Sequence, residues 1–243
     1  MAPFSFAIAL FVPMKKIFLA LLALVATAGT ASAQVEIGLK VSPAITSLRA
    51  ESTTKNAFAS DGSQLGFSGG LVVDYFFGEN YAFSTGLELA GKGGTIRYTD
   101  YQNSGSGNGN PVAVSMKIST QYLQLPLSVK LFTNEIAPAT RLYFQVGGSL
   151  NAPIGTRING SKFYTDPATG TENKAGDYVY FFDADALVAA GAEYTLGQST
   201  KLFAGLGYHR GLVNIDRYFA SKRGMSDVTI KNSSFGLDLG IKF

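Results

Sequence analysis

The chain of 243 residues carries 20 basic and 17 acidic side chains, which gives a net charge of +3. This near balance excludes the strongly basic surface typical of nucleic-acid-binding proteins, so no nucleic-acid partner is predicted. The sequence has no cysteine and only one histidine, which excludes a disulfide framework, a lipidated cysteine anchor and the usual thiolate or histidine-rich metal sites. No metal and no cofactor are therefore predicted.

The N-terminal 33 residues have the pattern of a secretory signal peptide. Met14 is followed by two lysines, residues 17–28 form an apolar core, and residues 31–33 are the small residues Ala-Ser-Ala. This order predicts cleavage between Ala33 and Gln34, with Met14 as the true start of the protein. The apolar core is shorter than the roughly 20 residues of a membrane-spanning helix, which disfavours an anchor.

Eight stretches of alternating apolar and polar residues follow in chain order. Strict alternation over such lengths predicts β-strands, and the 28 glycines with many tyrosines and phenylalanines favour the same class. The stretches are residues 35–42, 67–77, 81–90, 122–131, 141–150, 183–194, 202–209 and 235–243.

The connections between these stretches alternate in length. Short ones are predicted at residues 78–80, 133–140 and 197–200, and long polar loops at 46–64, 95–113, 156–179 and 214–231. This pattern is typical of an all-β fold, an eight-stranded antiparallel up-and-down transmembrane β-barrel with short periplasmic turns and long extracellular loops. Residues 34–243 are expected to form this one domain in the outer membrane of a Gram-negative bacterium, with membrane lipid as a partner and both termini periplasmic.

The two faces of the strands differ in composition. One face is almost continuously apolar, and the other is rich in glycine, alanine and serine with single charges, which favours lipid outside and a narrow polar interior. Aromatic residues concentrate on the apolar face at the short-turn end, as in an interfacial girdle: Tyr75, Phe77, Tyr81, Phe83, Phe144, Tyr194 and Phe243. The alternative is a soluble lipocalin-like barrel whose apolar face lines a ligand cavity.

The charged residues of the polar face are predicted to point inward. An eight-stranded barrel is about filled by side chains, and an unpaired charge inside it is costly, so a paired polar plug is expected rather than a conducting pore. The predicted lumen residues are Glu36, Lys40, Asp74, Glu88, Lys92, Lys130, Arg141, Asp183, Asp185, Glu193, Asp238 and Lys242.

Two segments resemble a known family. "YLQLPLSVKLF" at residues 122–132 and "YHRGLVNI" at residues 208–215 are similar to motifs of the PorT-like family of Bacteroidetes outer-membrane β-barrel proteins. The resemblance covers residues 34–243 and implies an eight-stranded barrel, export by the general secretory route and insertion by the barrel-assembly machinery. It also implies that the terminal aromatic residue, Phe243, is part of the assembly signal. The founding member is tied to a secretion system, a role that the resemblance does not assign to this chain.

One cluster offers candidate chemistry. His209 is predicted on the inward face near the top of its strand, with Asp183 and Asp185 on the neighbouring strand and Asp216 close behind. A histidine with carboxylates could activate water, which makes an outer-membrane hydrolase using His209 with Asp183 or Asp185 an alternative function. The simpler interpretation is a histidine hydrogen-bonded to an aspartate within the polar plug.

The leading prediction is a non-enzymatic barrel with a structural, adhesive or envelope-transport accessory role. An extracellular or envelope partner would contact the long loops, where exposed aromatic residues can act as anchors. Alternatively, these aromatic residues pack against each other at the rim. They are Tyr98, Tyr101, Phe163, Tyr164, Tyr178, Tyr180 and Phe181.

Overall fold

The structure is a computed structural model that describes residues 34–53, 57–100, 111–166, 170–197 and 199–243. The chain forms two units, Met1–Gln34 and Val35–Phe243, and the second contains all the described strands and helices. The predicted signal peptide, with its cleavage site after Ala33, lies outside the described residues and stays a prediction.

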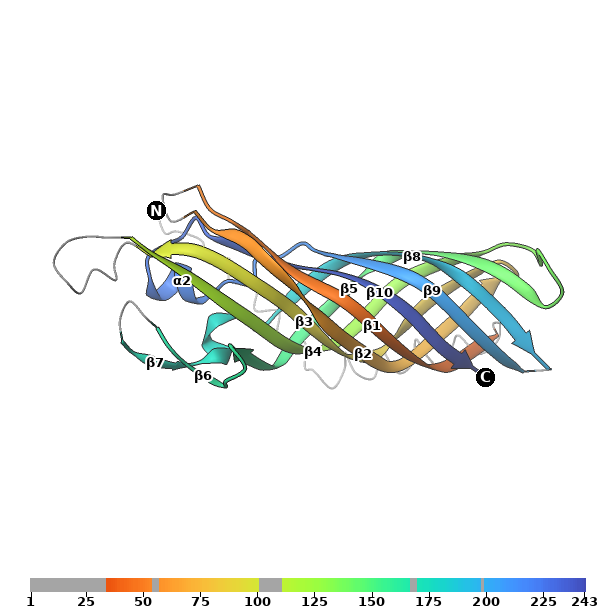
Figure 1. The fold of residues 1–243 in the computed structure, drawn as a ribbon. Helices are drawn as coiled ribbons and strands as arrows, with labels where there is room; N and C mark the ends of the chain where they lie inside the picture. The colour runs from red at the N-terminus through yellow and green to blue at the C-terminus, as the bar shows by residue number, and fades with distance from the viewer. Residues whose placement is uncertain (1–33, 54–56, 101–110, 167–169, 198) are drawn as a thin grey trace, which may run out of the picture. The chain divides into compact units, whose positions relative to one another are not determined.

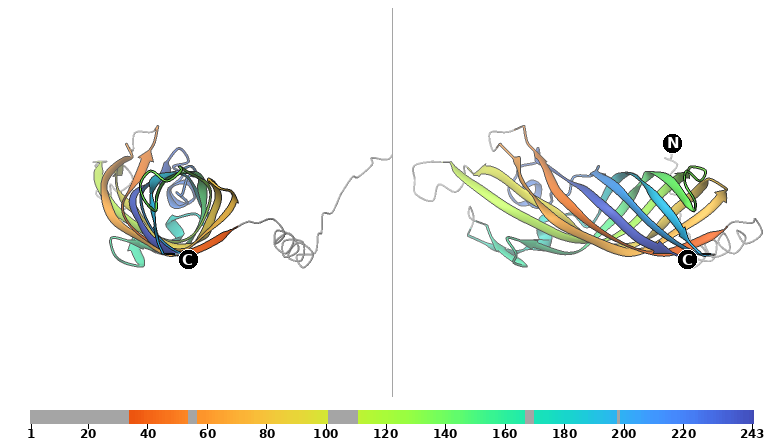
Figure 2. Two further views of the ribbon diagram at one scale, coloured as in Figure 1. Left: turned by 90° about the vertical axis from the view of Figure 1, so that its right-hand side faces the viewer. Right: turned by 45° about the vertical axis from the view of Figure 1, so that its right-hand side comes forward.

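The second unit is a closed barrel in which every strand is antiparallel to its neighbours, with the order β1-β10-β9-β8-β5-β4-β3-β2 (Figures 1 and 2). This ring confirms the predicted eight-stranded up-and-down fold. It closes where the N–H of Phe243 donates to the carbonyl of Ile37 at 2.9 Å. Its strands are β1 (Val35–Glu51), β2 (Ala59–Gly78), β3 (Tyr81–Asp100), β4 (Val112–Phe132), β5 (Thr140–Ile158), β8 (Asp183–Leu196), β9 (Thr200–Gly211) and β10 (Thr229–Lys242).

Four short elements lie at the end of the barrel away from the C-terminus (Figure 1). They are the hairpin strands β6 (Phe163–Thr165) and β7 (Glu172–Lys174), the 3₁₀ helix η2 (Ala175–Tyr178) and the α-helix α2 (Tyr218–Lys222). We call this end the cap end and the opposite one the base end. Within the described ranges, no helix is both long and apolar enough to cross a membrane.

The barrel strands are longer than predicted. Residues 46–64 and 95–113 were expected to be polar loops, but β1 runs to Glu51, β2 begins at Ala59, β3 runs to Asp100 and β4 begins at Val112. That part of the loop prediction is wrong. The polar tract at residues 103–110 lies outside the described residues.

The cause is a reversal of polarity along each long strand, which β4 shows clearly. In its base half, Leu123, Leu125 and Leu127 are exposed on the outer face. In its cap half the outer residues from Ser115 to Gln121 are polar, while Val114 and Met116 are buried inside. The alternation keeps its phase, so the strand continues where its outer face stops being apolar.

The outer face of the base half is a continuous apolar band. Its exposed side chains face away from the lumen, so the alternative of a soluble lipocalin-like barrel is wrong. Phe77, Tyr81 and Phe83 of the predicted girdle are exposed at its base edge, as are Phe144, Tyr194 and Phe243, whereas Tyr75 is half-buried. The band also includes Val35, Ile37, Leu39, Val41, Ile45, Leu71, Leu87, Leu89, Leu123, Leu125, Leu127, Leu131, Val146, Leu150, Val188, Leu202, Leu206, Phe235, Leu237 and Leu239.

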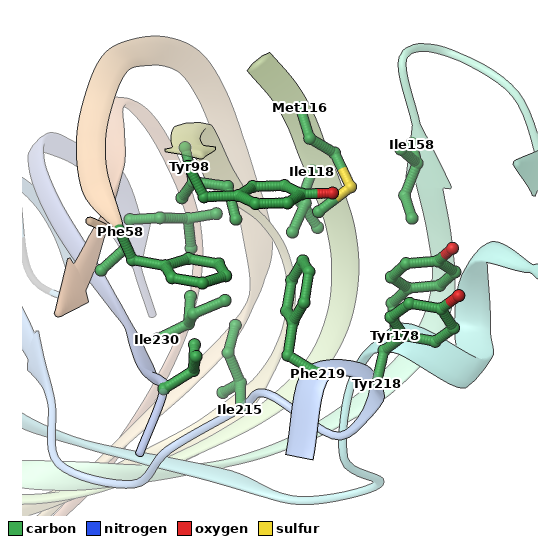
Figure 3. Packing of buried hydrophobic residues seen from close by; sticks show 14 of the residues in the cluster. Phe58, Tyr98, Met116, Ile118, Ile158, Tyr178, Ile215, Tyr218, Phe219 and Ile230 are labelled. Atoms are coloured by element: carbon green, nitrogen blue, oxygen red, sulfur yellow. The ribbon is translucent and has the colours of Figure 1, made fainter. Parts of the chain in front are cut away.

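The inside of the cap end is an apolar core (Figure 3). Phe58 stacks on Tyr98 with ring centroids 4.8 Å apart, and Phe219 of α2 packs edge-on against Phe58. Tyr178 of η2 stacks on Tyr218 of α2 at 3.9 Å. Leu48, Ile96, Met116, Ile118, Ile158, Ile215 and Ile230 complete much of this core.

Burial therefore removes some of the aromatic anchors that the sequence suggested. Tyr98 and Tyr178 are buried, and Tyr164 is partly buried against the same core. Phe163, Tyr180 and Phe181 remain exposed, and Tyr101 lies outside the described residues.

Candidate functional site

The base of the lumen is built around one buried lysine. Lys242 of β10 lies 2.8 Å from Asp74 and 3.1 Å from Glu36, and it also pairs with Glu193. Asp74 has a second cation at 2.9 Å, the ammonium of Lys130. Glu36 lies on the neighbouring strand β1, whereas the pairs Lys242–Asp74, Lys242–Glu193 and Lys130–Asp74 each connect strands that share no backbone hydrogen bonds.

Two further cations complete the base. Lys201 pairs with Glu36, and Arg141 lies 3.8 Å from Glu193. The guanidinium of Arg141 also stacks over Phe132 at 4.9 Å from its ring centroid, a cation–π contact. Lys201 was absent from the predicted lumen set because it precedes the stretch recognised as a strand, although the alternation of β9 extended by one residue would have found it.

Glycines make room for large side chains within this base. A methyl group on Gly191 or Gly205 would collide with the phenol of Tyr143. A methyl group on Gly240 would collide with the ring of Phe203. The glycine-rich polar face is therefore the counterpart of buried aromatic residues on other strands.

The middle of the lumen holds a second ion-pair group. Lys40 of β1 lies 2.8 Å from Glu88 and 3.7 Å from Asp238, whose carboxylate also accepts a hydrogen bond from Ser42. A small cavity beside them has room for a few water molecules and not for a larger solute.

The top of the lumen contains the candidate histidine. Nδ1 of His209 lies 2.8 Å from a carboxylate oxygen of Asp185. The other oxygen of Asp185 accepts hydrogen bonds from Lys92 at 2.7 Å and from Asn151 at 2.8 Å. Both carboxylate oxygens of Asp185 therefore have partners. This is expected of a carboxylate that orients a histidine, and also of one that neutralises a buried lysine in the lumen.

The other two predicted carboxylates do not join His209. Asp183 accepts a hydrogen bond from Asn232 at 2.8 Å. Asp216 accepts the backbone N–H of Phe219 and of Ala220 in the first turn of α2, each at 3.1 Å. Of the predicted cluster, the structure thus brings together only His209 and Asp185.

His209 has a further neighbour, Ser234, that its own sequence surroundings do not indicate. Ser234 of β10 stands directly opposite His209 in the β9–β10 pairing. Side chains at paired antiparallel positions lie on the same face, about 5 Å apart. Only the register between two distant segments reveals this neighbour.

One buried arginine stabilises the cap end, and no local sequence pattern predicts it. Arg223 follows α2 and is buried. Its guanidinium donates to both oxygens of Asp166 at 2.9 Å, and to both oxygens of Asp100 at 3.0 and 2.9 Å. One terminal nitrogen of the guanidinium serves Asp166 and the other serves Asp100, so these charge-assisted hydrogen bonds connect the end of α2 to β3 and to the segment after β6. These carboxylates raise the pKa of Arg223 further above its usual value, against the effect of burial.

No group of three or more histidine, aspartate or glutamate side chains with metal-binding geometry occurs among the described residues. The lumen can therefore be described chemically as paired charges in a filled interior. The apolar band around it, and the apolar core above it, complete the picture of a barrel built for a bilayer.

These features define the class: an integral outer-membrane β-barrel protein. The chain belongs to the outer membrane protein beta-barrel domain family, whose model matches residues 28–217. No curated protein matches the chain.

Among solved structures, the fold is similar to Neisserial surface protein A, with 16% identity over 87% of this chain and 98% of the other and a TM-score of 0.46. The attachment invasion locus protein Ail of Yersinia pestis shares 13% identity over 86% of this chain and 99% of the other, with a TM-score of 0.36. The outer membrane protease OmpT of Escherichia coli shares 10% identity over 89% of this chain and 99% of the other, with a TM-score of 0.47.

Proposed function

We propose that this protein is a non-enzymatic, non-conducting barrel that displays a rigid folded cap at the membrane surface, in a structural or adhesive role. The observation that carries the proposal is that the interior is filled along its length. Ion pairs fill it within the apolar band, and an apolar core fills it beyond the band. A filled interior supports no solute path, and a cap fixed by Arg223 suits recognition at a surface.

The proposal includes an orientation. The base end, where β1 begins and β10 ends, faces the periplasm, and the cap end faces the medium. Cleavage between Ala33 and Gln34 follows export, and the barrel-assembly machinery reads Phe243 during insertion. The side chain of Phe243 is 60% exposed at the end of β10, which leaves it accessible to such a reader. Membership of the PorT-like family of Bacteroidetes, and any part in envelope transport, stay predictions from the two motifs.

The experiment is a conductance measurement on the refolded protein in planar bilayers. We expect no current steps above those of the empty bilayer. Faster gel migration of unboiled than of boiled protein establishes that the sample is folded. Stable open steps from folded protein would overturn the non-conducting part of the proposal. Protease accessibility of the cap in intact cells tests the orientation, because a cap that faces the periplasm is cut only after the cells are broken.

A second candidate is an outer-membrane hydrolase, favoured by the bonded pair His209–Asp185 with Ser234 opposite. A serine, a histidine and a carboxylate on three consecutive strands have the composition of a nucleophilic triad. Ester, lipid and peptide hydrolysis by the wild type is compared with that of His209→Ala and Ser234→Ala, with Ser128→Ala as a buried control serine. Loss of hydrolysis in the first two variants alone establishes the enzyme, and the absence of hydrolysis by the wild type rejects it.

A further inference from the structure

Three basic side chains gather on the outer wall of the barrel where β1, β10 and β9 lie side by side (Figure 1). Arg49 of β1 is paired with Lys231 of β10. Arg210 of β9 is paired with Ser233, two residues further along β10. All of these positions alternate with inward residues, so their side chains share the outer face.

The side-chain conformation of Arg49 places it closer to Arg210 than the pairing of the strands alone requires. The guanidinium of Arg49 reaches across β10 and donates to the carbonyl of Gly211 at 2.6 Å, beside Arg210. Nε of Arg49 is buried and has no hydrogen-bond partner among the described residues. The hydroxyl groups of Ser233 and Tyr208 lie 3.2 Å apart on the same face. Two guanidinium groups, an ammonium group and two hydroxyl groups thus form one polar cluster.

This cluster lacks the usual counter-charges. Within the part of the chain that the structure describes, none of the ion pairs includes Arg49, Arg210 or Lys231, although Glu51 lies on the same face two residues along β1. The lumen lysines, by contrast, all have carboxylate partners. Arg49 and Lys231 are half-buried and Arg210 is exposed. Cations without an ion-pair partner on a protein wall, two of them partly desolvated, indicate an anion supplied from outside.

The position of the cluster specifies the source of that anion. It borders the cap-side edge of the apolar band, where Ile45 and Phe235 are paired and exposed. Arg210 is flanked by Tyr208 on β9 and by Leu212, which follows β9 and is 56% exposed. Cations at the edge of a lipid-facing band lie at the depth of lipid headgroups.

We propose that Arg49, Arg210 and Lys231, with the hydroxyl groups of Tyr208 and Ser233, bind the phosphate groups of a phosphorylated lipid headgroup. Guanidinium groups match phosphate oxygens in a bidentate manner, and hydroxyl groups complete the coordination. The acyl chains of the same lipid would lie on the apolar band below. The proposed orientation of the barrel, with its cap end toward the medium, determines only which leaflet supplies the lipid, and that leaflet is the outer one.

The test uses the folded full barrel in non-ionic detergent, with native mass spectrometry of bound lipid. The probes are lipid A carrying two phosphates, the same lipid with its phosphates removed, and inorganic phosphate alone. The triple variant is Arg49→Gln, Arg210→Gln, Lys231→Gln. We expect it to bind diphosphorylated lipid A about 100-fold more weakly than the wild type, because each cation near a membrane surface contributes about 1 kcal/mol.

A matched control neutralises three exposed cations farther from the band edge: Lys117→Gln, Lys162→Gln, Lys174→Gln. We expect its affinity to stay within about threefold of the wild type. If the triple variant fails to fold, the double variant Arg210→Gln, Lys231→Gln keeps the Arg49 hydrogen bond, and its expected loss is about 30-fold.

Three results would overturn the proposal. Equal binding of dephosphorylated lipid would show acyl packing alone, and an equal loss in the control would show unspecific charge attraction. Full displacement of lipid A by millimolar inorganic phosphate would assign the site to free phosphate. Insertion into phosphatidylcholine bilayers and heat-modifiable gel migration do not require the phosphate site. These two measurements therefore test the proposed function independently of lipid A binding.

Discussion

At the level of single residues, the lumen shows how a buried lysine becomes tolerable. Lys242 is fully buried, and desolvation of an ammonium group costs several kcal/mol unless carboxylates surround it. Lys242 is paired with Gly38 on β1, and any side chain at position 38 would collide with Lys242 and with the β10 backbone. Glycine on one strand thus provides the space and carboxylates on others the charge, and a register slip by one residue would lose both.

The first prediction concerns this lysine. Lys242→Met is expected to lower the free energy of unfolding by about 3 kcal/mol, because it removes the cation that Asp74, Glu36 and Glu193 share and breaks three buried ion pairs at once. Each of these carboxylates then keeps a single cation, from Lys130, Lys201 or Arg141. Urea unfolding of protein refolded in detergent micelles measures the change. Lys117→Met, at an exposed position on β4, is the control and should change stability by less than about 0.5 kcal/mol. Equal shifts in the two variants would contradict the proposed plug.

The second prediction concerns a glycine. Gly205→Ala is expected to destabilise the barrel by about 1–3 kcal/mol, since the new methyl group meets the phenol of Tyr143 and the carbonyl of Ala190. Combining it with Tyr143→Leu should cost less than the sum of the two single changes, because the smaller side chain relieves the collision. Gly176→Ala, where the methyl group meets nothing within 4 Å, is the matched control. Strict additivity of the double variant would rule out the collision.

At the level of elements, the cap depends on side chains rather than on helix propensity. α2 has 5 residues, too few for a helix to persist alone in water. Phe219 anchors it in the apolar core, Arg223 ties its end to two carboxylates, and Asp216 accepts N–H groups of its first turn. Loss of any of these three contacts should loosen α2 before it affects the barrel.

The third prediction follows from Asp216. Burial raises the pKa of its carboxyl group from 3.8 to about 6, although backbone N–H groups act in the opposite direction. In the unfolded chain the group titrates near its usual value, so the folded cap binds an extra proton between these two values. Its contribution to stability is complete below about pH 4 and is lost as the pH rises through about 6, by at most about 3 kcal/mol.

Amide hydrogen exchange of Phe219 and Ala220, corrected for the intrinsic pH dependence, measures this effect. Protection in the wild type should fall between about pH 4 and pH 7. In Asp216→Asn, which keeps one acceptor oxygen and cannot titrate, protection should be constant. Asp177→Asn, at an exposed position in η2, should retain the wild-type pH dependence. A constant wild-type profile would exclude Asp216 as the titrating group.

At the level of the whole molecule, period-two alternation was enough to predict the ring and its outward and inward faces. Ten of the twelve predicted lumen charges are buried in the structure, and Lys40 and Arg141 are half-buried beside carboxylates of the lumen. The two faces of a strand are distinguishable by the alternation of the sequence. The lengths of the strands were not predictable in the same way. Beyond Tyr122 on β4 the alternation persists with its polarity reversed, and a search for apolar outer faces ends there.

The contacts between distant segments were also beyond the sequence. Arg223 meets Asp100 and Asp166 across 123 and 57 residues, and nothing local distinguishes it from other basic residues. Similarly, Asp185 rather than Asp183 meets His209, although both point inward on β8. Strand stagger decides such pairs, and stagger depends on the closure of the complete ring.

The last prediction tests the reversal of polarity itself. Leu127→Arg places a cation at the middle of the apolar band and is expected to lower the unfolding free energy in phosphatidylcholine bilayers by about 2–4 kcal/mol. Gln121→Arg changes an exposed outer residue of the same strand, just beyond the band, and should cost about 0–1 kcal/mol. Both substitutions share strand, face and charge, so only depth in the bilayer distinguishes them. Equal losses of stability would mean that the hydrocarbon layer of the bilayer does not end near Tyr122. The polar outer face and the apolar core of the cap end would then have a cause other than the boundary of the bilayer.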